Sequence, residues 1–378
     1  MFNCQYLEQD LPRYFPGHSI QVSRAPAGEV ISSLVFSGSN YRLTNRTNKE
    51  PRFHKTAVNA MCDLISDLAL AEAENSTSDL CFHASATATA SGLILFPATR
   101  RAGKSVLSLA LADQGARLFS DDFLPVTLEN DLAVGQATGI SPRLRLPLPD
   151  MIAGTVNGLV AERSAPNNDQ YLYVPLDAKY LASAREPLGI SAIVLPTRQE
   201  DGPAVLTPLP PSTVLKSLLK QNFATQRHGA LVLDDLATIA TSIQGYELSY
   251  CDPHEAAGLI MSRLGGLTPP LLTRFSAPKA RADQTQATGD PKEYRRNSDC
   301  HAFVIDDCLF YARPDGSQVG HMDGSAVYLW TLLLEPTSES QAIELLQDAF
   351  SAVPADQIAA DTKVVFQKLK EQGLIQSA

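Results

Sequence analysis

The sequence lacks the features that mark membrane, secreted and zinc-binding proteins. Its 378 residues contain no apolar run close to the roughly 20 residues that span a bilayer. The N-terminal segment carries acidic residues where a signal peptide needs lysine or arginine. The 6 cysteines include no C-x-x-C pair, which disfavours a zinc site and favours reduced, mostly buried thiols. We therefore expect a cytoplasmic protein with no membrane partner.

The sequence also lacks an excess of basic residues. Its 31 Lys and Arg are outnumbered by 41 Asp and Glu, so the net charge is −10. This acidic balance argues against nucleic acid or an anionic membrane surface as a general partner. A composition that is 44% hydrophobic and 19% charged is typical of a soluble protein with two or three domains. We expect no nucleic-acid partner, and we allow for a homo-oligomer.

One segment lacks the aliphatic and aromatic residues from which cores are built. Residues 276–298 contain no Leu, Ile, Val, Phe or Met. Such a run cannot offset its ordering entropy by burial, which predicts a flexible linker. The linker divides the chain into an N-terminal domain, residues 1–275, and a C-terminal domain, residues 299–378.

A strand–loop–helix–strand pattern organises the N-terminal domain. Residues 92–96 form an apolar run of strand length, and residues 97–105 form a polar turn that leads into a helical pattern. A second short strand, residues 116–119, is followed by Asp121 and Asp122. This order of elements, with acids after the second strand, is typical of a P-loop site for phosphoryl transfer.

The residues of the polar turn suit phosphate binding. Backbone N–H groups that enter a helix N-terminus favour phosphate oxygens, and Gly103 permits their close approach. Lys104 can neutralise the outer phosphates, and the Ser105 hydroxyl can hold Mg²⁺. The turn departs from the usual pattern at its front, where Ala98 replaces the first glycine. An ordinary strand–helix turn is the alternative interpretation.

The spacing of three residues points to a family. His83 lies 21 positions before Lys104, and Asp121 lies 17 positions after it. This pattern resembles the catalytic core of HPr kinase/phosphorylase and its relatives, which phosphorylate a serine hydroxyl with a P-loop. The resemblance implies an α/β fold with an HPr-kinase-like P-loop core, together with ATP and Mg²⁺ as cofactors.

The resemblance also implies a role for each residue of the site. Asp121 is the base that accepts the proton of the substrate hydroxyl, and His83 is a proton relay or orienting group. Lys104 is catalytic as well as phosphate-binding, and Ser105 with Asp122 holds the metal. The nucleotide-binding loop comprises Ala98, Thr99, Arg100, Arg101, Ala102, Gly103, Lys104 and Ser105.

The sequence departs from the family at two places. Arg100 and Arg101 stand where the family has serine and glycine, so they either grip phosphate or crowd the nucleotide. A downstream glutamate in an E-x-R-G motif is also missing, and residues 142–146 read Pro-Arg-Leu-Arg-Leu instead. Arg143 and Arg145 would share one face of a strand and meet phosphate, a peptide carboxylate or solvent. These departures indicate a divergent relative.

Two further patterns have structural interpretations. An apolar stripe predicts an amphipathic helix over about residues 56–73. A second acid pair, Asp234 and Asp235, has no phosphate loop before it. We interpret Asp234 as the N-cap of a helix that starts at Leu236, and not as part of a site.

The sequence of the C-terminal domain predicts three short strands followed by three helices. This order is typical of a winged helix-turn-helix of the α+β class. The strands are expected at residues 301–305, 308–311 and 318–322, and the helices at about 324–334, 338–350 and 355–372. Asp323 is the expected cap of the first helix.

This domain resembles the PqqD-like peptide-recognition domains of ribosomal peptide pathways. The marks are Asp323, Ala326 and Trp330, and a closing Leu369 with Gly373-Leu374-Ile375. The resemblance implies that a leader peptide adds as a strand to residues 318–322 and lies against the last helix. A DNA-binding winged helix is the alternative, which the acidic residues of the domain disfavour.

Together the two domains predict a peptide-modifying enzyme. We expect an ATP- and Mg²⁺-dependent kinase that acts on a serine or threonine hydroxyl of a ribosomally synthesised precursor peptide, with the leader bound by the C-terminal domain. The alternative is a nucleotide-binding peptide chaperone or adaptor without turnover. A third possibility is that phosphorylation only activates the peptide for a later modification.

Overall fold

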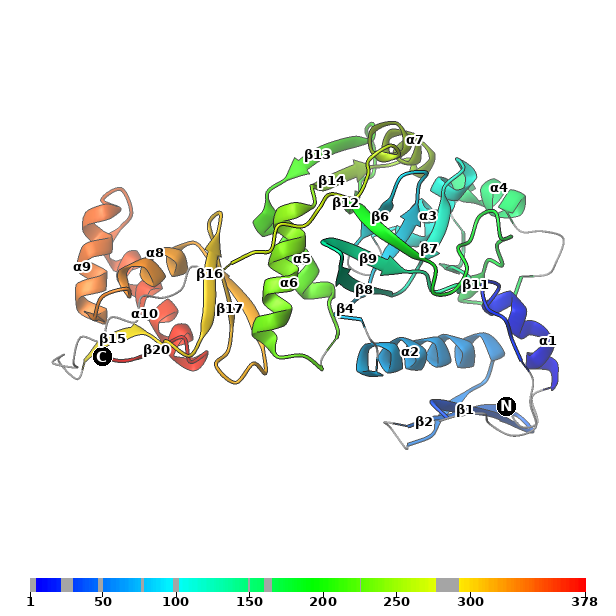
Figure 1. Ribbon diagram of the computed structural model, residues 1–378, viewed down its shortest axis with the longest axis horizontal. Coiled ribbons are helices and arrows are strands. Elements are labelled where there is room, and N and C mark those ends of the chain that lie inside the picture. Colours follow the sequence, from blue (N-terminus) through cyan, green and yellow to red (C-terminus); the bar gives the residue numbers. More distant parts are fainter. Residues whose placement is uncertain are drawn as a thin grey trace. The chain divides into compact units, whose positions relative to one another are not determined.

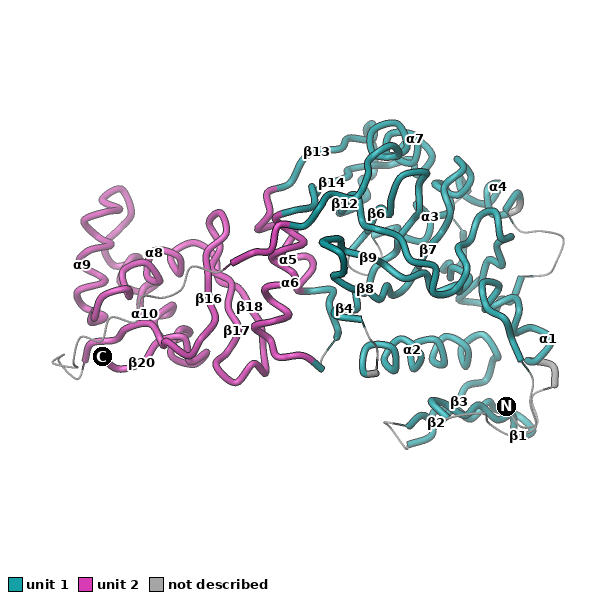
Figure 2. The backbone as a smooth tube through the Cα atoms, in the orientation of Figure 1, with its two compact units in different colours: residues 1–209, 220–226, 242–272 teal, residues 210–219, 227–241, 273–378 magenta. Residues whose placement is uncertain are grey.

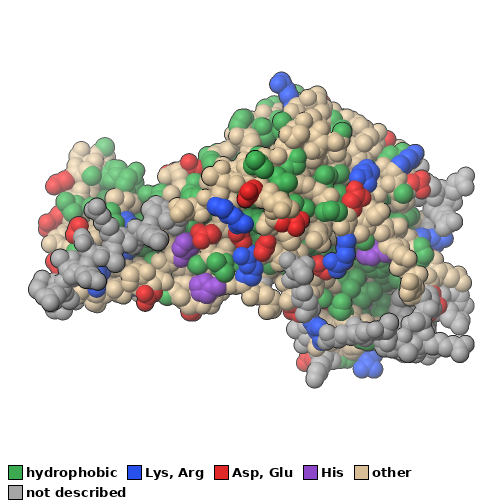
Figure 3. Space-filling model, viewed as in Figure 1, with side chains coloured by type: hydrophobic (Ala, Val, Ile, Leu, Met, Phe, Trp, Pro, Cys, Tyr) green, Lys and Arg blue, Asp and Glu red, His purple; other side chains and the backbone are tan. Residues whose placement is uncertain are grey.

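The structure is a computed structural model that describes residues 5–21, 30–46, 50–75, 78–97, 102–148, 150–159, 165–224, 226–276 and 292–378. The chain forms two compact units (Figure 2). Unit 1 contains residues 1–209, 220–226 and 242–272, and unit 2 contains residues 210–219, 227–241 and 273–378. Charged side chains of both signs are interspersed on the face shown in Figure 3.

Unit 1 is built on a nine-stranded sheet (Figure 1). Seven strands follow one another in the order β4-β8-β9-β12-β6-β5-β7, and β14 joins β12 and carries β13. Their bounds are β4 Leu80–Phe82, β5 Ser85–Ala88, β6 Leu93–Phe96, β7 Arg117–Ser120, β8 Leu124–Glu129, β9 Leu132–Gln136, β12 Pro187–Arg198, β13 Val205–Leu209 and β14 Gly245–Tyr250.

The long strand β12 joins an antiparallel half of the sheet to a mixed half. Its first residues pair antiparallel with β9, and its later residues pair parallel with β6 and with β14. The predicted strand at residues 92–96 is confirmed as β6, whose four residues are all buried. A continuous apolar run is expected for a strand that is covered on both faces.

Three helices cover one face of the mixed half. They are α3 Lys104–Asp113, α4 Asp150–Leu159 and α7 Pro253–Leu264, and α3 packs against both of the others. Their apolar side chains form one core with β6, β7, β12 and β14. The sequence places α3 correctly, and Gly115 just beyond its end has the positive φ of 93° that a helix C-terminal glycine supplies.

A second core of unit 1 lies beside α2, residues Ala57–Asn75, which confirms the predicted amphipathic helix. The other elements of unit 1 are α1 Gln5–Tyr14, β1 Ser32–Ser37, β2 Asn40–Asn45, β3 Arg52–His54, β10 Arg143–Arg145 and β11 Tyr171–Tyr173. β1, β2 and β3 form an antiparallel sheet, and β10 pairs with β11.

Unit 2 combines a helical hairpin with the C-terminal elements. The hairpin is α5 Pro211–Gln221, of which residues 211–219 belong to unit 2, and α6 Gly229–Ser242. The other elements are β15 Glu293–Arg296, β16 His301–Ile305, β17 Cys308–Ala312, β18 Val319–Asp323, α8 Ser325–Leu332, β19 Thr337–Ser338, α9 Glu339–Ala349, α10 Ala355–Glu371 and β20 Ile375–Ser377. The three strands and three helices expected from the sequence are present, each within two residues of its predicted bounds.

Two helix caps were predicted wrongly. Helix α6 begins at Gly229, so Asp234 lies inside it instead of capping it, and its carboxylate meets His301 Nε2 at 2.7 Å. Asp323 does not cap α8, because the N-cap is Gly324 and the Asp323 carboxylate pairs with Lys216 at 2.6 Å. Both carboxylates join α5 or α6 to the sheet of β16, β17 and β18, contacts that a local sequence pattern does not reveal.

Part of the predicted linker, residues 276–298, forms a strand in the structure. Residues 277–291 lie outside the described residues, whereas Glu293–Arg296 form strand β15, which pairs with β19 and β20. Backbone pairing holds this strand, and the Tyr294 ring packs against Phe366 and under the Lys370 ammonium. A strand stabilised by its backbone and one aromatic ring needs no aliphatic residues.

Within the described part of the chain, no helix combines the length and the hydropathy needed to cross a bilayer.

Candidate active site

Strand pairing brings the predicted site residues of unit 1 to one edge of the sheet. Strand β5 pairs antiparallel with both β6 and β7, with Ser85 opposite Phe96 and Ala86 opposite Ser120. The start of β5 therefore lies beside the C-terminal ends of β6 and β7. His83 precedes β5, the predicted phosphate loop follows β6, and the acid pair follows β7. Ligands commonly bind α/β sheets at such carboxyl ends.

The described end of the predicted phosphate loop has the backbone of a helix entry. Gly103 is the N-cap of α3 with φ 84°, a left-handed conformation that glycine adopts without steric cost. Lys104 and Ser105 form the first turn of α3, where backbone N–H groups lack intrahelical acceptors. Lys104 is buried, with 8% of its surface exposed. A buried ammonium at a helix N-terminus suits an anionic ligand.

Tyr250 positions this end of the loop. Its hydroxyl donates a hydrogen bond of 3.3 Å to the Ala102 carbonyl. A Cβ on Gly103 would lie 2.4 Å from the Tyr250 hydroxyl oxygen. Tyr250 ends β14, which runs parallel to β12 as β6 does, so all three strands end at this edge. We did not identify Tyr250 as a site residue from the sequence, because only the sheet order brings it to the loop.

A tight turn between β7 and β8 carries the acid pair. The Ser120 hydroxyl donates to the Phe123 carbonyl and thereby closes the turn around Asp121 and Asp122. Asp121 is buried, with 6% of its surface exposed, whereas the Asp122 side chain is 38% exposed. The two carboxylates therefore have different environments although they are neighbours in the chain.

The Asp121 carboxylate is held by one oxygen. Its Oδ2 accepts the backbone N–H of Arg143 at 3.0 Å, and its Oδ1 is buried with no hydrogen-bond partner among the described residues. Burial and the Asp122 charge raise the pKa of Asp121 to about 6, against the opposing effects of the Arg143 N–H and the nearby Ser105 hydroxyl. A carboxylate with a free oxygen and a pKa near neutrality can accept a proton.

Arg143 contacts both members of the acid pair. Its backbone binds Asp121, and its guanidinium lies 3.4 Å from the Asp122 carboxylate and 5.0 Å from the centre of the Tyr171 ring. Arg145 lies over the same ring at 5.8 Å, which confirms that the two arginines share a face of β10. The sequence left phosphate, a peptide carboxylate and solvent open as partners of these arginines. In the structure, their partners are the Asp122 carboxylate and the Tyr171 ring of the protein itself.

His83 lies in the turn between β4 and β5. Its backbone N–H donates to the Gln221 carbonyl at 2.8 Å, and the next residue, Ala84, offers its carbonyl to the Ser120 hydroxyl at 3.4 Å. The backbone of this turn is therefore tied to the turn that carries the acids. His83 is thus placed at the edge where its proposed partners lie.

The two predicted metal ligands, Ser105 and Asp122, have different partners in the structure. Ser105 lies against Asp121, whereas Asp122 contacts Arg143. The described residues contain no group of three or more His, Cys, Asp and Glu side chains that could hold a metal. Mg²⁺ commonly takes one or two protein ligands and completes its shell with substrate phosphates and water, so the site still fits this ion. The loop residues Ala98, Thr99, Arg100 and Arg101 lie outside the described residues.

The predicted peptide-binding strand lies at the edge of a sheet in unit 2. The strand order is β16-β17-β18, so β18 pairs with β17 on one side, and no other described strand pairs with it. Helix α8 packs against β18, and α10 packs against α8. An unpaired strand edge offers backbone groups that an extended peptide can pair with.

Comparison with known proteins identifies one domain. Residues 311–375 match the family model described as Coenzyme PQQ synthesis protein D (PqqD), and this region is a PqqD domain. None of the curated proteins matches the chain. Among solved structures, the HPr(Ser) kinase/phosphatase from Coxiella burnetii matches with 16% sequence identity, over 48% of this chain and 91% of that chain, with a TM-score of 0.26. A score this low does not by itself define a fold. The chain is thus an α/β protein with a C-terminal PqqD domain.

Proposed function

We propose that this protein is a P-loop kinase that transfers the γ-phosphoryl group of ATP to a serine or threonine hydroxyl of a ribosomally synthesised precursor peptide. The observation that carries the proposal is the convergence of Lys104 and Ser105, at the start of α3, with the acid pair after β7. Ser105 lies against Asp121, and Asp121 presents a buried oxygen that the described residues leave unpaired.

In the proposed reaction, Asp121 accepts the proton of the substrate hydroxyl. The hydroxyl oxygen then bonds to the γ-phosphorus, the bond to the bridging oxygen breaks, and ADP leaves. Lys104 and the N–H groups at the start of α3 hold the phosphates, and His83 orients the groups around Asp121. Mg²⁺, held by Ser105 and Asp122, would neutralise the charge on the phosphates. Arg143 fixes both carboxylates and so acts as a positioning residue.

The PqqD domain supports a peptide as the substrate. In the proposed complex, the leader adds to the free edge of β18 and lies against α10, with the domain forming a winged helix-turn-helix. A leader bound in this way raises the effective concentration of the acceptor segment at the kinase site.

The test is mass spectrometry of a leader-containing precursor peptide after incubation with ATP and Mg²⁺. The expected product carries one phosphate on a serine or threonine, and Asp121→Asn should form it about 10²–10⁴ times more slowly. An unmodified peptide together with bound nucleotide would contradict the kinase and support a nucleotide-binding adaptor.

A further inference from the structure

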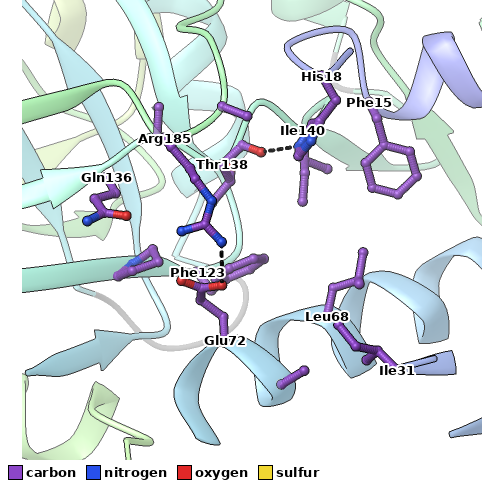
Figure 4. Close-up of a pocket in the computed structure, with 14 residues that line it drawn as sticks. Phe15, His18, Ile31, Leu68, Glu72, Phe123, Gln136, Thr138, Ile140 and Arg185 are labelled. Carbon is purple, nitrogen blue, oxygen red and sulfur yellow. Dashed lines mark hydrogen bonds and ion pairs between the residues drawn. The ribbon is translucent and has the colours of Figure 1, made fainter. Parts of the chain in front are cut away.

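A cavity of about 460 Å³ opens in unit 1 beside the turn that carries the acid pair (Figure 4). Helix α2 contributes Leu68, Ala71 and Glu72 to one wall, and Phe123 lies at another. This volume falls within the range of about 300–1,000 Å³ that is typical of ligand pockets. Nothing in the proposed kinase reaction uses the cavity.

The cavity walls are fixed by contacts within the protein. The Thr138 N–H donates to the Phe119 carbonyl at 3.0 Å, and the Thr138 carbonyl contacts the His18 ring at 2.7 Å. The Phe15 ring packs edge-on against His18, with 5.6 Å between the ring centres. The pocket is therefore preformed, and an occupant would not have to order its walls.

The lining favours a neutral, apolar occupant. Most of the lining residues are aliphatic, aromatic or proline. The two charged lining residues, Glu72 and Arg185, pair with each other at 3.3 Å, as Figure 4 shows. A charged occupant would lose its hydration and would have to compete with this ion pair.

The chain links the cavity directly to the proposed phosphoryl-transfer site. Phe123 follows Asp122, and consecutive Cα atoms are about 3.8 Å apart. In the segment that connects β9 to β10, Thr138 and Ile140 line the cavity. Arg143, a few residues later, contacts both acids. An extended chain advances about 3.3–3.6 Å per residue, so a peptide whose hydroxyl meets the acid pair can reach the cavity with a residue that is close in sequence.

We propose that this cavity is a specificity pocket that receives one bulky apolar side chain of the acceptor peptide, close in sequence to the phosphorylated residue. This inference rests on the proposed kinase function, because the acid pair defines where the hydroxyl lies. It predicts that the core segment of the substrate, and not only its leader, contributes to recognition.

The test uses short glycine–alanine peptides with one serine and one varied residue, placed in turn at each position near the serine. The varied residue is Phe, Ala or Lys, and binding to the full-length protein with ADP and Mg²⁺ is measured by calorimetry. At one position the Phe peptide should bind about tenfold or more tightly than the Ala peptide, and the Lys peptide should bind no better than Ala.

Two variants connect that preference to the cavity. Ala71→Phe places a ring in the cavity and should abolish the preference for the Phe peptide. Leu70→Phe introduces the same residue at the next, exposed position of α2 and should keep it. Circular dichroism and thermal unfolding check that both variants fold, and Ala184→Leu fills the cavity from another lining position if Ala71→Phe does not fold.

The outcomes separate this inference from the kinase proposal. Equal binding of all peptides to the wild-type protein, no peptide binding, or a preference that persists in the filled variants would overturn the pocket. Transfer of labelled phosphate from ATP to the same peptides is measured in parallel. Selective binding without transfer supports the pocket and contradicts the kinase, whereas transfer without selectivity does the reverse.

Discussion

The raised pKa of Asp121 predicts that this carboxylate destabilises the fold. Burial and Asp122 raise its pKa from 3.8 to about 6. A shift of one unit corresponds to about 1.4 kcal/mol, so the ionised carboxylate costs the folded state up to about 3 kcal/mol. Asp121→Asn removes the ionisable group and keeps an oxygen for the Arg143 N–H. We expect this variant to be more stable than the wild type at pH 8 and to have lost most of the proposed transferase activity.

The pH dependence follows from the sign of the shift. Between about pH 4 and pH 6 the folded state binds more protons than the unfolded state, so the stability of the wild type falls as the pH rises through this window. The advantage of Asp121→Asn should therefore be small at pH 4, grow up to about pH 6 and then remain constant. If Asp121 is the base of the proposed kinase, the rate of phosphoryl transfer should rise with pH up to about 6 as this carboxylate ionises.

Urea unfolding at several pH values, followed by circular dichroism, measures this difference. Asp122→Asn is the matched control, because its side chain is more exposed and pairs with Arg143 at 3.4 Å. That variant loses the Arg143 pair but also lowers the pKa of Asp121 by removing the neighbouring charge, so it should gain less stability at pH 8 than Asp121→Asn. An Asp121→Asn protein that is less stable at pH 8, or whose advantage is the same at pH 4 and pH 8, would refute the reasoning.

Three further predictions concern the loop and the C-terminal domain. Lys104→Ala should weaken ADP binding in calorimetry, and unchanged affinity would exclude the lysine from the phosphate site. Gly103→Ala adds about 1–3 kcal/mol of backbone strain and a clash with the Tyr250 hydroxyl, so ADP binding should fall and the added change Tyr250→Phe should partly restore it. A fragment 292–378 should melt at a higher temperature than a fragment 299–378, because only the longer one keeps β15 between β19 and β20. Equal melting temperatures would contradict a structural role for that strand.

Local patterns predicted the elements of the site well. The strand β6, the helix α3 and the strand β7 lie where hydrophobic periodicity and Gly115 placed them. These features depend on residues that are close together in the sequence. The order of the strands depends on distant residues, and this order brings Tyr250 to the predicted phosphate loop.

The difference between the two carboxylates could not be predicted from the sequence. Asp121 and Asp122 are chemically identical neighbours, and alternation along a strand indicates only that they face different ways. The pKa of Asp121 depends on its burial and on Arg143, which lies 22 positions away. Contacts of this kind arise only when distant segments pack.

The boundary between the two compact units could not be predicted from the sequence either. The composition of residues 276–298 predicts a domain boundary there, but residues 210–219 and 227–241 belong to unit 2 and not to the unit that contains the predicted phosphate loop. Phe303 on β16 is almost fully buried and packs against Phe275, with 4.4 Å between the ring centres. His301 on the same strand meets Asp234 of α6.

Cutting the chain at the predicted linker would therefore also remove residues that cover one face of the sheet of β16, β17 and β18. The sheet of β16, β17 and β18 has two faces, and its Leu309 and Tyr311 face packs on α8 and α10. The alternating residues Phe303 and Phe310 lie on the other face and are buried in the intact chain. Because α6 and Phe275 contact this face, residues 299–378 alone would expose two phenylalanines to water. The PqqD domain thus depends for its stability on α6 and Phe275, which precede the predicted linker in the sequence.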